Sequence, residues 1–308
     1  MNSLCILMAT YNGEHHLKEQ LETIKSQSYG NWDLLVSDDG STDTTLDLLD
    51  QFKDDCEVQH SVKIIQGPKQ GFVANFLSLV ANSSSDAKYF AFSDQDDLWY
   101  DDKLQRAVDL IEKEPENIPV LYCSRTEVIF ENSEFKSFLS PLMQQSPSFN
   151  NALVQSIAGG NTMVFNRAAR DSLLKFGVDV EVASHDWWIY QVVTGVGGKV
   201  IYDGRPSLKY RQHGENLVGA NRGVSALFDR AVMFLNGRFK IYNDKNIQAL
   251  LTNRRYLTQE CQQSLNSFFV MKYGNIWQRL NAFFSSKIRR QGKVFNFALC
   301  FGILFKKV

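Results

Sequence analysis

Residues 88–99 read Lys-Tyr-Phe-Ala-Phe-Ser-Asp-Gln-Asp-Asp-Leu-Trp, so three carboxylates fall within four positions directly after an apolar, aromatic run. The run predicts a buried strand, with the acids at its carboxyl end. Ligands of an open α/β sheet bind at that edge. Asp94, Asp96 and Asp97 repel one another unless a cation lies between them, and hard divalent cations prefer carboxylate oxygens. A cation site is therefore predicted here, with a solvated acidic turn before the next helix as the alternative.

Strand-like and helix-like segments alternate through the first half of the chain. Apolar runs predict four strands, over residues 4–9, 32–36, 62–65 and 89–92. Helical periodicity lies between them and after Asp101, an order typical of an α/β fold whose mostly parallel sheet is flanked by helices. Beyond Asn221 the pattern turns helical. Residues 132–151 predict an irregular loop that serves as a lid or acceptor-binding element, with disorder as the plain alternative.

Length and composition indicate an ordinary globular chain. Its 308 residues are 44% hydrophobic and carry a formal net charge of −1, enough for one large domain or two small ones. The five cysteines are scattered and never form a Cys-x-x-Cys pair, which argues against a disulfide framework and a zinc site and indicates a reducing cytoplasm. The first residues enter a strand without the pattern of a signal peptide, so secretion is not expected.

Polar loops follow the first and second predicted strands. Residues 9–13 read Ala-Thr-Tyr-Asn-Gly, and residues 38–43 read Asp-Asp-Gly-Ser-Thr-Asp. Loops at the carboxyl ends of neighbouring parallel strands face one crevice. Neither loop has the glycine spacing of a phosphate-binding loop. An anionic ligand in this crevice must therefore be held by a metal ion and side chains.

Six motifs resemble, in order and spacing, those of the family 2 glycosyltransferases of the GT-A fold. Besides the three stretches above, they are residues 160–163 (Gly-Asn-Thr-Met), 185–188 (His-Asp-Trp-Trp) and 210–216 (Tyr-Arg-Gln-His-Gly-Glu-Asn). The resemblance covers about the first 220 residues, and six motifs in register are far more specific than any one. The Asp-Gln-Asp-Asp-x-Trp and His-Asp-Trp-Trp forms resemble the bacterial branch that contains rhamnosyltransferases. The Gln-x-x-Arg-Trp signature of processive synthases is absent from the sequence, which favours the addition of a single sugar.

The resemblance implies a nucleotide-sugar donor bound together with Mg²⁺ or Mn²⁺. Tyr11 and Asp39 would contact the nucleobase, since a carboxylate accepts the imide N–H of uracil or thymine. Asp96 would ligate the metal, which bridges the donor diphosphate and neutralises the leaving group. His213 would be a further metal ligand and Arg211 a phosphate clamp, with an ion pair to a surface acid as the alternative for Arg211. The residues assigned to the donor are Thr10, Tyr11, Asp39, Asp94, Asp97 and Arg211.

An inverting transfer needs one base to remove the proton of the acceptor hydroxyl. Asp186 matches the second acidic motif of the family, in which many members have Glu-Asp where this chain has His-Asp. The role of His185 stays open between a function and a packed, satisfied histidine. The two tryptophans that follow could stack on the acceptor sugar or pack in the core. Glycines before Asn161 permit close backbone approach to a sugar, although a strand bulge explains them as well. The residues assigned to the acceptor are Gly160, Asn161, Trp187 and Trp188.

The charge distribution separates the C-terminal part from the rest. Residues 261–308 hold eight Lys or Arg and no Asp or Glu, among many aromatic side chains, whereas the other 260 residues have a net charge of −9. The apolar run 294–305 is too short to cross a membrane. It suits an interfacial helix on an anionic membrane surface, or an amphipathic helix packed on the catalytic domain. We therefore expect a GT-A catalytic domain over 1–222, divided into a nucleotide-sugar binding part (1–105) and an acceptor and catalytic part (106–222), and a basic, aromatic helical region over 223–308.

Together these features predict an inverting, metal-dependent glycosyltransferase on the inner, cytoplasmic face of the bacterial plasma membrane. It would move one sugar, with rhamnose from dTDP-rhamnose as the leading donor, to a lipid-linked oligosaccharide in O-antigen, capsule or cell-wall synthesis, with no nucleic acid as partner. UDP-galactose, UDP-glucose or another UDP-sugar would use the same site. A haloacid-dehalogenase-type phosphatase is a rival, but Leu98 stands where its motif needs Thr or Val. A non-catalytic cation or nucleotide sensor is another, although the EF-hand pattern fails at Leu98 and Trp99.

Overall fold

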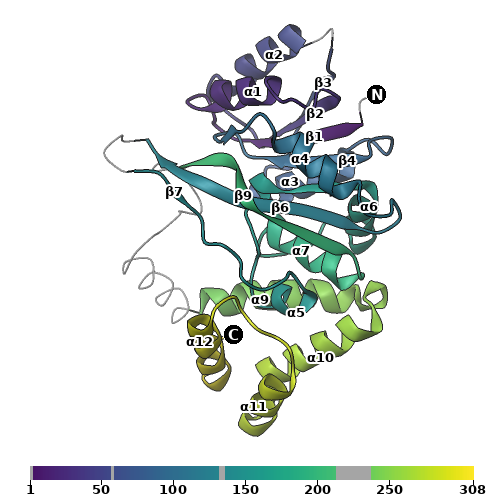
Figure 1. Ribbon diagram of the computed structural model, residues 1–308, viewed down its shortest axis with the longest axis vertical. Helices are drawn as coiled ribbons and strands as arrows, with labels where there is room; N and C mark the ends of the chain where they lie inside the picture. Colours follow the sequence, from purple (N-terminus) through teal and green to yellow (C-terminus); the bar gives the residue numbers. More distant parts are fainter. Residues whose placement is uncertain (1–2, 57–58, 132–135, 213–236) are drawn as a thin grey trace.

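The computed structural model describes residues 3–56, 59–131, 136–212 and 237–308. Its strands are β1 (Leu4–Thr10), β2 (Trp32–Asp38), β3 (Val62–Gln66), β4 (Tyr89–Ser93), β5 (Leu98–Trp99), β6 (Val120–Phe130), β7 (Phe138–Leu139), β8 (Val164–Asn166) and β9 (Lys199–Gln212). Within the described ranges they form a 9-stranded sheet of order β3-β2-β1-β4-β8-β6-β9-β5, with β7 paired to β6 (Figure 1). The first four strands are parallel, as are β6 and β9, while β5, β7 and β8 pair antiparallel to their neighbours. The predicted, mostly parallel sheet is confirmed.

Helices cover both faces of the sheet, as predicted. One face packs against α1 (Leu17–Lys25), α2 (Thr45–Cys56) and α4 (Lys103–Ile111), and the other against α3 (Phe72–Asn82), α6 (Arg167–Phe176) and α7 (His185–Gly195). Successive side chains of β1 point to opposite faces of the sheet. Ile6 belongs to the core under α1, α2 and α4, and Leu7 belongs to the second core, under α3, α6 and α7. A strand buried on both faces in this way reads as the continuous apolar run seen in the sequence.

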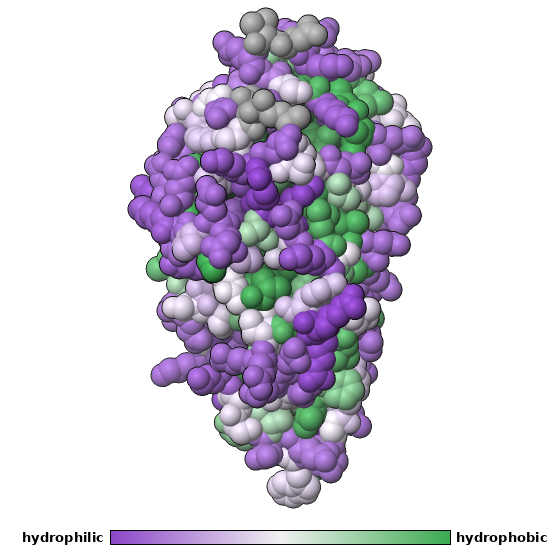
Figure 2. Space-filling view, turned by 90° about the vertical axis from the view of Figure 1, so that its right-hand side faces the viewer, coloured by the Kyte–Doolittle hydropathy of each residue, from purple (hydrophilic) through white to green (hydrophobic). Residues whose placement is uncertain are grey.

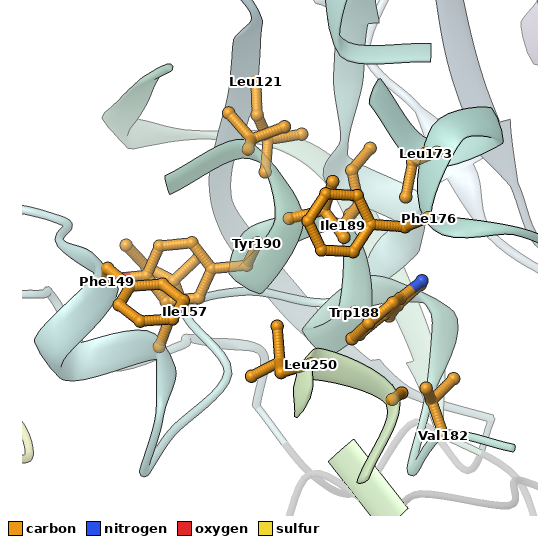
Figure 3. Close-up of a cluster of buried hydrophobic side chains, with 14 of the residues drawn as sticks. Leu121, Phe149, Ile157, Leu173, Phe176, Val182, Trp188, Ile189, Tyr190 and Leu250 are labelled. Carbon is orange, nitrogen blue, oxygen red and sulfur yellow. The ribbon is translucent and has the colours of Figure 1, made fainter. Parts of the chain in front are cut away.

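Four C-terminal helices extend the second core below α7 (Figure 1). They are α9 (Arg238–Thr252), α10 (Gln259–Tyr273), α11 (Ile276–Ser285) and α12 (Lys293–Leu304). Figure 3 shows Leu250 of α9 in one cluster with Trp188 of α7 and Phe149. Gln291, just before α12, accepts from the N–H of Gln145 (N to Oε1, 2.9 Å). The C-terminal helices thus share one apolar core with the sheet and with α3, α6 and α7. In the portion of the chain that the structure describes, no helix is long and apolar enough to cross a membrane.

Two short elements differ from the sequence pattern. β5 lies inside the acidic motif and exists through its antiparallel pairing with β9, in which Leu98 faces Lys209. Local periodicity cannot reveal a strand whose partner lies over a hundred residues away. The loop predicted over 132–151 contains, in its described part, β7 and the start of α5 (Phe149–Ala152), and is otherwise irregular. Short 3₁₀ turns occur at η1 (Gly160–Thr162) and η2 (Arg254–Tyr256).

Candidate active site

The loops that follow β1, β2 and β4 meet at one edge of the sheet. The parallel register pairs Thr10 with Asp38 and places Met8 beside Ser93, so the three loops leave the sheet together. Gln95 joins two of them. Its side chain accepts from the Tyr11 N–H (N to Oε1, 2.9 Å) and donates to the Tyr11 carbonyl (Nε2 to O, 3.1 Å). The acidic motif is therefore tied directly to the loop after β1.

Thr10 supports this edge from below, whereas Tyr11 is open to solvent. The Thr10 hydroxyl is buried and donates to Oδ2 of Asp38 at 2.9 Å. The other oxygen of Asp38 accepts from the N–H groups of Gly40 (3.0 Å) and Ser41 (2.8 Å). Tyr11 is 58% exposed, so its ring is free to stack on a planar group. Both residues were predicted to bind the nucleotide-sugar donor. In the structure the Thr10 side chain supports the loop after β2, and the Tyr11 ring is exposed and can contact a ligand.

Asp39 connects the loop after β2 with the loop after β3. Its Oδ1 accepts from the N–H of Lys69 at 2.6 Å, and its Oδ2 accepts from the N–H of Gly71 at 2.9 Å. The approach is tight, because a Cβ at Gly67 would lie 2.8 Å from Oδ1 of Asp39. Each carboxylate oxygen can accept more than one hydrogen bond. Asp39 is thus fixed in place, and its carboxylate can still accept a further hydrogen bond, for example from a ligand.

The acid cluster, by which we mean Asp94, Asp96 and Asp97, lies at the end of β4. Asp97 is buried, and its Oδ2 accepts from Nδ2 of Asn161 at 2.6 Å. Burial, and then the charge of Asp96, raises the pKa of Asp97 to about 7. Burial and the charges of Asp97, Asp96 and Asp186 raise the pKa of Asp94 well above its usual range. Carboxylates this close in a desolvated place favour a bound cation.

Among the described residues, two positive side chains lie beside the acid cluster, and both are engaged. Arg211 of β9 forms an ion pair with Glu19 of α1, and its Nε donates to the carbonyl of Asp96 at 3.3 Å. This is the ion pair that the sequence left open as the alternative for Arg211. Lys103, the first residue of α4, is fully buried, and its charge lowers the pKa of both Asp94 and Asp97. Arg211 is thus shared with Glu19, and Lys103 acts on Asp94 and Asp97 together.

The acid cluster fits a divalent cation that takes few ligands from the protein. Oδ1 of Asp97 is buried and lacks a hydrogen-bond partner among the described residues. Carboxylate oxygens suit Mg²⁺ and Mn²⁺, and such sites complete their coordination with water and substrate phosphates. Outside the undescribed stretches, no three His, Cys, Asp or Glu side chains come together in a geometry that would hold a metal ion. His213, the further ligand predicted, lies outside the described residues.

Asp186 lies in the first turn of α7, close enough to the acid cluster for its charge to act on Asp94. Its Oδ1 accepts from the hydroxyl of Ser184, the N-cap residue, and from the N–H of Trp187 at 2.6 Å. Burial raises the pKa of Asp186, against the effect of these hydrogen bonds. Because the charge of Asp186 also raises the pKa of Asp94, the two acidic motifs of the sequence are neighbours in space. The carboxylate is therefore oriented and placed beside a candidate cation site.

His185 packs in the core next to Asp186. Its ring stacks on Phe76 with 3.8 Å between centroids and contacts Phe92 at 5.0 Å. Burial lowers the pKa of His185 to about 3, so the ring is neutral. A Cβ at Gly160 would lie 2.2 Å from Nε2 of His185. The ring is packed, and the glycine at position 160 gives it room, but neither ring nitrogen has a hydrogen-bond partner among the described residues. The structure therefore shows a packed histidine that is not satisfied, and a function for His185 stays open.

The rings of Trp187 and Trp188 are buried. Trp187 donates from Nε1 to the carbonyl of Ala152 at 2.6 Å and stacks on Phe239 of α9. Trp188 is 0% exposed and lies edge-on to Phe176 in the cluster of Figure 3. A fully buried ring offers no face to a sugar. Both placements favour core packing, the alternative that the sequence left open.

Sequence reasoning missed two residues that the structure places at the site. No role was predicted for Gln95 from the sequence, yet its side chain ties the acidic motif to Tyr11. No role was predicted for Lys103 either, yet it is buried beside the acid cluster. One signal was available for Lys103, because a cation at the start of a helix opposes the helix dipole. No comparable signal marked Gln95.

Comparisons with known sequences agree with these motifs. The model of the family "Glycosyl transferase family 2" matches residues 5–174, more than half of the chain. The dTDP-rhamnosyl transferase RfbG of Shigella flexneri is 29% identical over 237 residues, which cover 74% of this chain and 79% of that protein. The UDP-Glc:alpha-D-GlcNAc-diphosphoundecaprenol beta-1,3-glucosyltransferase WfgD of Escherichia coli is 30% identical over 162 residues, covering 53% of this chain and 59% of that protein.

Solved structures of low sequence identity share the fold. Residues 1–349 of S. aureus TarS, in complex with UDP-GlcNAc, match with a TM-score of 0.54 at 15% identity over 91% of this chain and 79% of that one. The mannosyltransferase PcManGT from Pyrobaculum calidifontis, in complex with GDP-Man and Mn²⁺, matches with a TM-score of 0.54 at 15% identity over 97% of this chain and 78% of that one. The predicted GT-A fold is confirmed. With its family model matched over more than half of the sequence, the chain belongs to glycosyl transferase family 2.

Proposed function

We propose that this glycosyltransferase is an inverting, metal-dependent enzyme that moves one sugar from a nucleoside diphosphate to an acceptor hydroxyl. The observation that carries the proposal is the position of Asp186 beside the acid cluster. The cluster lies at the edge of the sheet where the loops after β1, β2 and β4 meet. In the proposed step the acceptor oxygen bonds to the anomeric carbon from the face opposite the phosphate. The bond from that carbon to the phosphate oxygen breaks, and its electron pair leaves with the nucleoside diphosphate. The hydroxyl proton passes to Asp186.

Asp186 suits the role of base because its surroundings both orient it and raise its pKa. The Ser184 hydroxyl and the Trp187 N–H hold Oδ1, and the Gly160 N–H adds a further hydrogen bond to the carboxylate. Each carboxylate oxygen can accept more than one hydrogen bond, so the proposal assigns Oδ2 to the acceptor hydroxyl. A base is most effective when its pKa approaches the working pH, and burial moves Asp186 in that direction. Gly160 and Asn161 lie in the adjacent η1 turn and supply backbone on the acceptor side.

The donor would lie across the edge of the sheet. Tyr11 would stack on the nucleobase, and Asp39 would accept its imide N–H. A cation at Asp96, with Asp94 beside it and His213 as a further ligand, would neutralise the departing diphosphate. Arg211 would exchange Glu19 for a donor phosphate. That exchange is inexpensive, because the Glu19 side chain is 61% exposed and such ion pairs stabilise by about 0–1 kcal/mol.

For the sugar, we propose dTDP-rhamnose as the first donor to test. The support is the relative that aligns over 74% of the chain and is named a dTDP-rhamnosyl transferase. UDP-glucose is the second, because two E. coli relatives are named for it. Their names also contain a diphosphoundecaprenol acceptor, which supports a lipid-linked acceptor here and a place in bacterial surface-polysaccharide synthesis.

The donor proposal is tested by thermal stabilisation of the purified protein. We expect dTDP-rhamnose or a UDP-sugar to raise the unfolding temperature with Mn²⁺ or Mg²⁺ present, and EDTA to abolish the shift. Release of phosphate from a generic phosphomonoester is the control for the phosphatase alternative, which leaves the loops at Tyr11 and Asp39 unexplained. Stabilisation by no nucleotide sugar, with or without metal, would contradict the proposal.

We further propose that the C-terminal helices attach the enzyme to an anionic membrane surface on the cytoplasmic face. α12 buries one stripe, Leu299 and Ile303, and packs by it on the rest of the protein. Its other stripe is apolar and exposed, at positions 294, 297, 301 and 305. The two alternatives of the sequence therefore describe opposite faces of one helix. An exposed apolar face of this kind marks an interaction surface.

The exposed surface continues onto α11 and is bordered by positive charge. Trp277 is 78% exposed and Phe297 is 77% exposed, with Phe284 between them in sequence. Figure 2, which views the molecule from the right-hand side of Figure 1 and so from the side away from α12, shows that apolar residues, in green, also lie among hydrophilic ones in the lower part of that face. The basic residues of this end are Lys287, Arg289, Arg290, Lys293, Lys306 and Lys307. Aromatic groups and cations together suit an anionic lipid surface.

Binding to vesicles tests the attachment. We expect the wild-type protein to co-sediment with phosphatidylglycerol vesicles and the double variant Trp277→Ala/Phe297→Ala to bind about 10- to 100-fold more weakly, because two exposed aromatic rings are lost. Leu46→Ala is the matched control, since Leu46 is an exposed apolar residue on α2 at the opposite end of the molecule. Equal binding by the double variant and the wild type would overturn this part of the proposal.

A further inference from the structure

Lys103 occupies a place that two physical preferences disfavour for a lysine. Its side chain is fully buried, although an ammonium group is costly to remove from water. It is also the first residue of α4, where the positive end of the helix dipole repels a cation. Residues that break local rules without a gain in stability concentrate at functional sites. The surroundings of Lys103 therefore indicate what it does.

The contacts of Lys103 lead to the acid cluster. Its Nζ lies 3.3 Å from the centroid of the Trp99 ring, in a cation–π contact, and donates a hydrogen bond to the carbonyl of Asn161. The side chain of the same asparagine donates from Nδ2 to Oδ2 of Asp97 at 2.6 Å. Three separate segments, β5, α4 and the η1 turn, are joined by these contacts. The series ends at a carboxylate whose other oxygen, Oδ1, is buried without a hydrogen-bond partner among the described residues.

We propose that Lys103 is a positioning residue of the donor site, which holds Asn161 so that its amide fixes Asp97. With Oδ2 held by Asn161, Oδ1 of Asp97 is left for the donor complex. This inference depends on the proposed function, because it gives Asp97 a part in donor binding. Lys103 itself touches neither donor nor acceptor in this arrangement. Burial lowers the pKa of Lys103 well below its usual range, and the charges of Asp97 and Asp94 oppose this, so the ammonium charge beside the acid cluster depends on the carboxylates that would bind a cation.

The variant Lys103→Met separates these two effects, because it keeps the length and apolar character of the side chain and removes the ammonium. Titration with Mn²⁺ alone should show affinity equal to or higher than that of the wild type, since a repelling cation is gone from beside the acid cluster. The variant is also titrated with dTDP-rhamnose and with UDP-glucose at saturating Mn²⁺. Whichever donor the wild type binds should bind about 10- to 100-fold more weakly, which is the range typical of losing a contact that supports a ligand-binding residue. A merely structural role would move both affinities in the same direction.

Two further variants guard against a general loss of folding. Lys272→Met removes another buried lysine, which pairs with Asp244 at 3.2 Å on the C-terminal helices, and should keep wild-type donor affinity. Asn161→Ala removes the amide that holds Asp97 but keeps the backbone carbonyl that Lys103 binds. It should weaken donor binding by a similar factor. The double variant Lys103→Met/Asn161→Ala should bind donor no more weakly than the weaker single variant, because both act through Asp97.

The outcomes are distinguishable. Parallel loss of Mn²⁺ and donor affinity in Lys103→Met, unchanged donor affinity, or full additivity with Asn161→Ala would each overturn the inference and leave the proposed function standing. If Lys103→Met fails to fold, Asn161→Ala alone decides, and wild-type donor affinity in that variant would overturn the inference. If the wild type binds neither donor with Mn²⁺ present, the proposed function fails and this inference fails with it.

Discussion

The two ends of the molecule place their unusual residues in opposite ways. At the edge of the sheet, two charged groups that prefer water, Asp97 and Lys103, are buried, and the other two carboxylates of the acid cluster are half-buried beside them. On α11 and α12, apolar groups that prefer the core are exposed, with Trp277 and Phe297 as the extreme cases. Burial of charge marks a place where a ligand supplies the missing partner. Exposure of apolar surface marks a place where a second surface does so. The comparison predicts a small ionic ligand at one end and an extended apolar one at the other.

The largest effect that would sharpen this comparison is expected at Asp186. Asp186→Asn keeps the size of the side chain and removes the base, so we expect turnover to fall by about 10²- to 10⁴-fold. Donor binding should change little, because Asp186 acts on the acceptor. Nucleoside diphosphate release and donor titration measure the two quantities. Asp171→Asn, at a partly exposed carboxylate on α6, is the control. Wild-type turnover in Asp186→Asn would remove the base assignment.

Asp96 tests the ionic ligand itself. Asp96→Asn replaces a candidate metal ligand with a neutral amide, and we expect Mn²⁺ affinity to fall by at least about 100-fold, beyond the usual effect of losing an outer contact. Titration calorimetry with Mn²⁺ measures this directly. Glu116→Gln removes a highly exposed carboxylate that pairs with Lys88, next to the opposite end of β4, and should leave the affinity unchanged. Unchanged Mn²⁺ binding in Asp96→Asn would place the cation elsewhere.

At the other end, Lys306 and Lys307 test whether the exposed surface meets an anionic partner. Lys306→Gln/Lys307→Gln should weaken binding to phosphatidylglycerol vesicles by about tenfold, since each basic residue near such a surface contributes about 1 kcal/mol before screening. Salt should weaken the wild type more than this variant. Vesicle sedimentation at low and high salt gives both numbers. Identical salt dependence of the two proteins would mean that charge plays no part.

The smallest effect at neutral pH is expected at His185, which tests whether every buried polar group marks a ligand. Burial lowers the pKa of His185 to about 3, while in the unfolded chain it titrates near 6.5. As the pH falls from 6.5 toward 3, His185 becomes protonated in the unfolded chain but stays neutral in the native state. Stability should therefore fall by up to about 1.4 kcal/mol per pH unit from this group.

The variant His185→Phe fits the same aromatic surroundings and should lose this slope. Urea unfolding at pH 7 and pH 5 measures the free energy of unfolding in each case. His15→Gln is the control, because His15 is exposed and should keep the wild-type slope. An unchanged slope in His185→Phe would show that His185 does not stay neutral in the native state.

Local patterns in the sequence were enough for the N-terminal half of the fold. Strands such as Tyr89–Ser93 and helices such as Phe72–Asn82 follow from runs and periodicity that involve near neighbours only. The acidic motif and its place at the end of a strand were readable for the same reason. β5 was not, because its two residues depend on pairing with β9.

The contacts that complete the site join residues far apart in the sequence. Lys103 and Asn161 are 58 positions apart, Gln95 and Tyr11 are 84 apart, and Arg211 and Glu19 are 192 apart. No local propensity encodes such pairs, because each forms only when the sheet brings two loops together. The same holds for Trp187 and Trp188, whose burial depends on packing against α6, α9 and the segment around Ala152. Residue types could be predicted, but their neighbours could not.

The most direct test of the central claim is the rate of nucleoside diphosphate release from dTDP-rhamnose and UDP-sugars by the wild-type enzyme, measured against Mn²⁺ concentration with EDTA as the zero point. If the acid cluster and Asp186 form a metal-dependent transfer site, release from at least one donor will rise and saturate with Mn²⁺ and will stop in EDTA. Release that is equally fast in EDTA, or no release from any donor at saturating Mn²⁺, would contradict it.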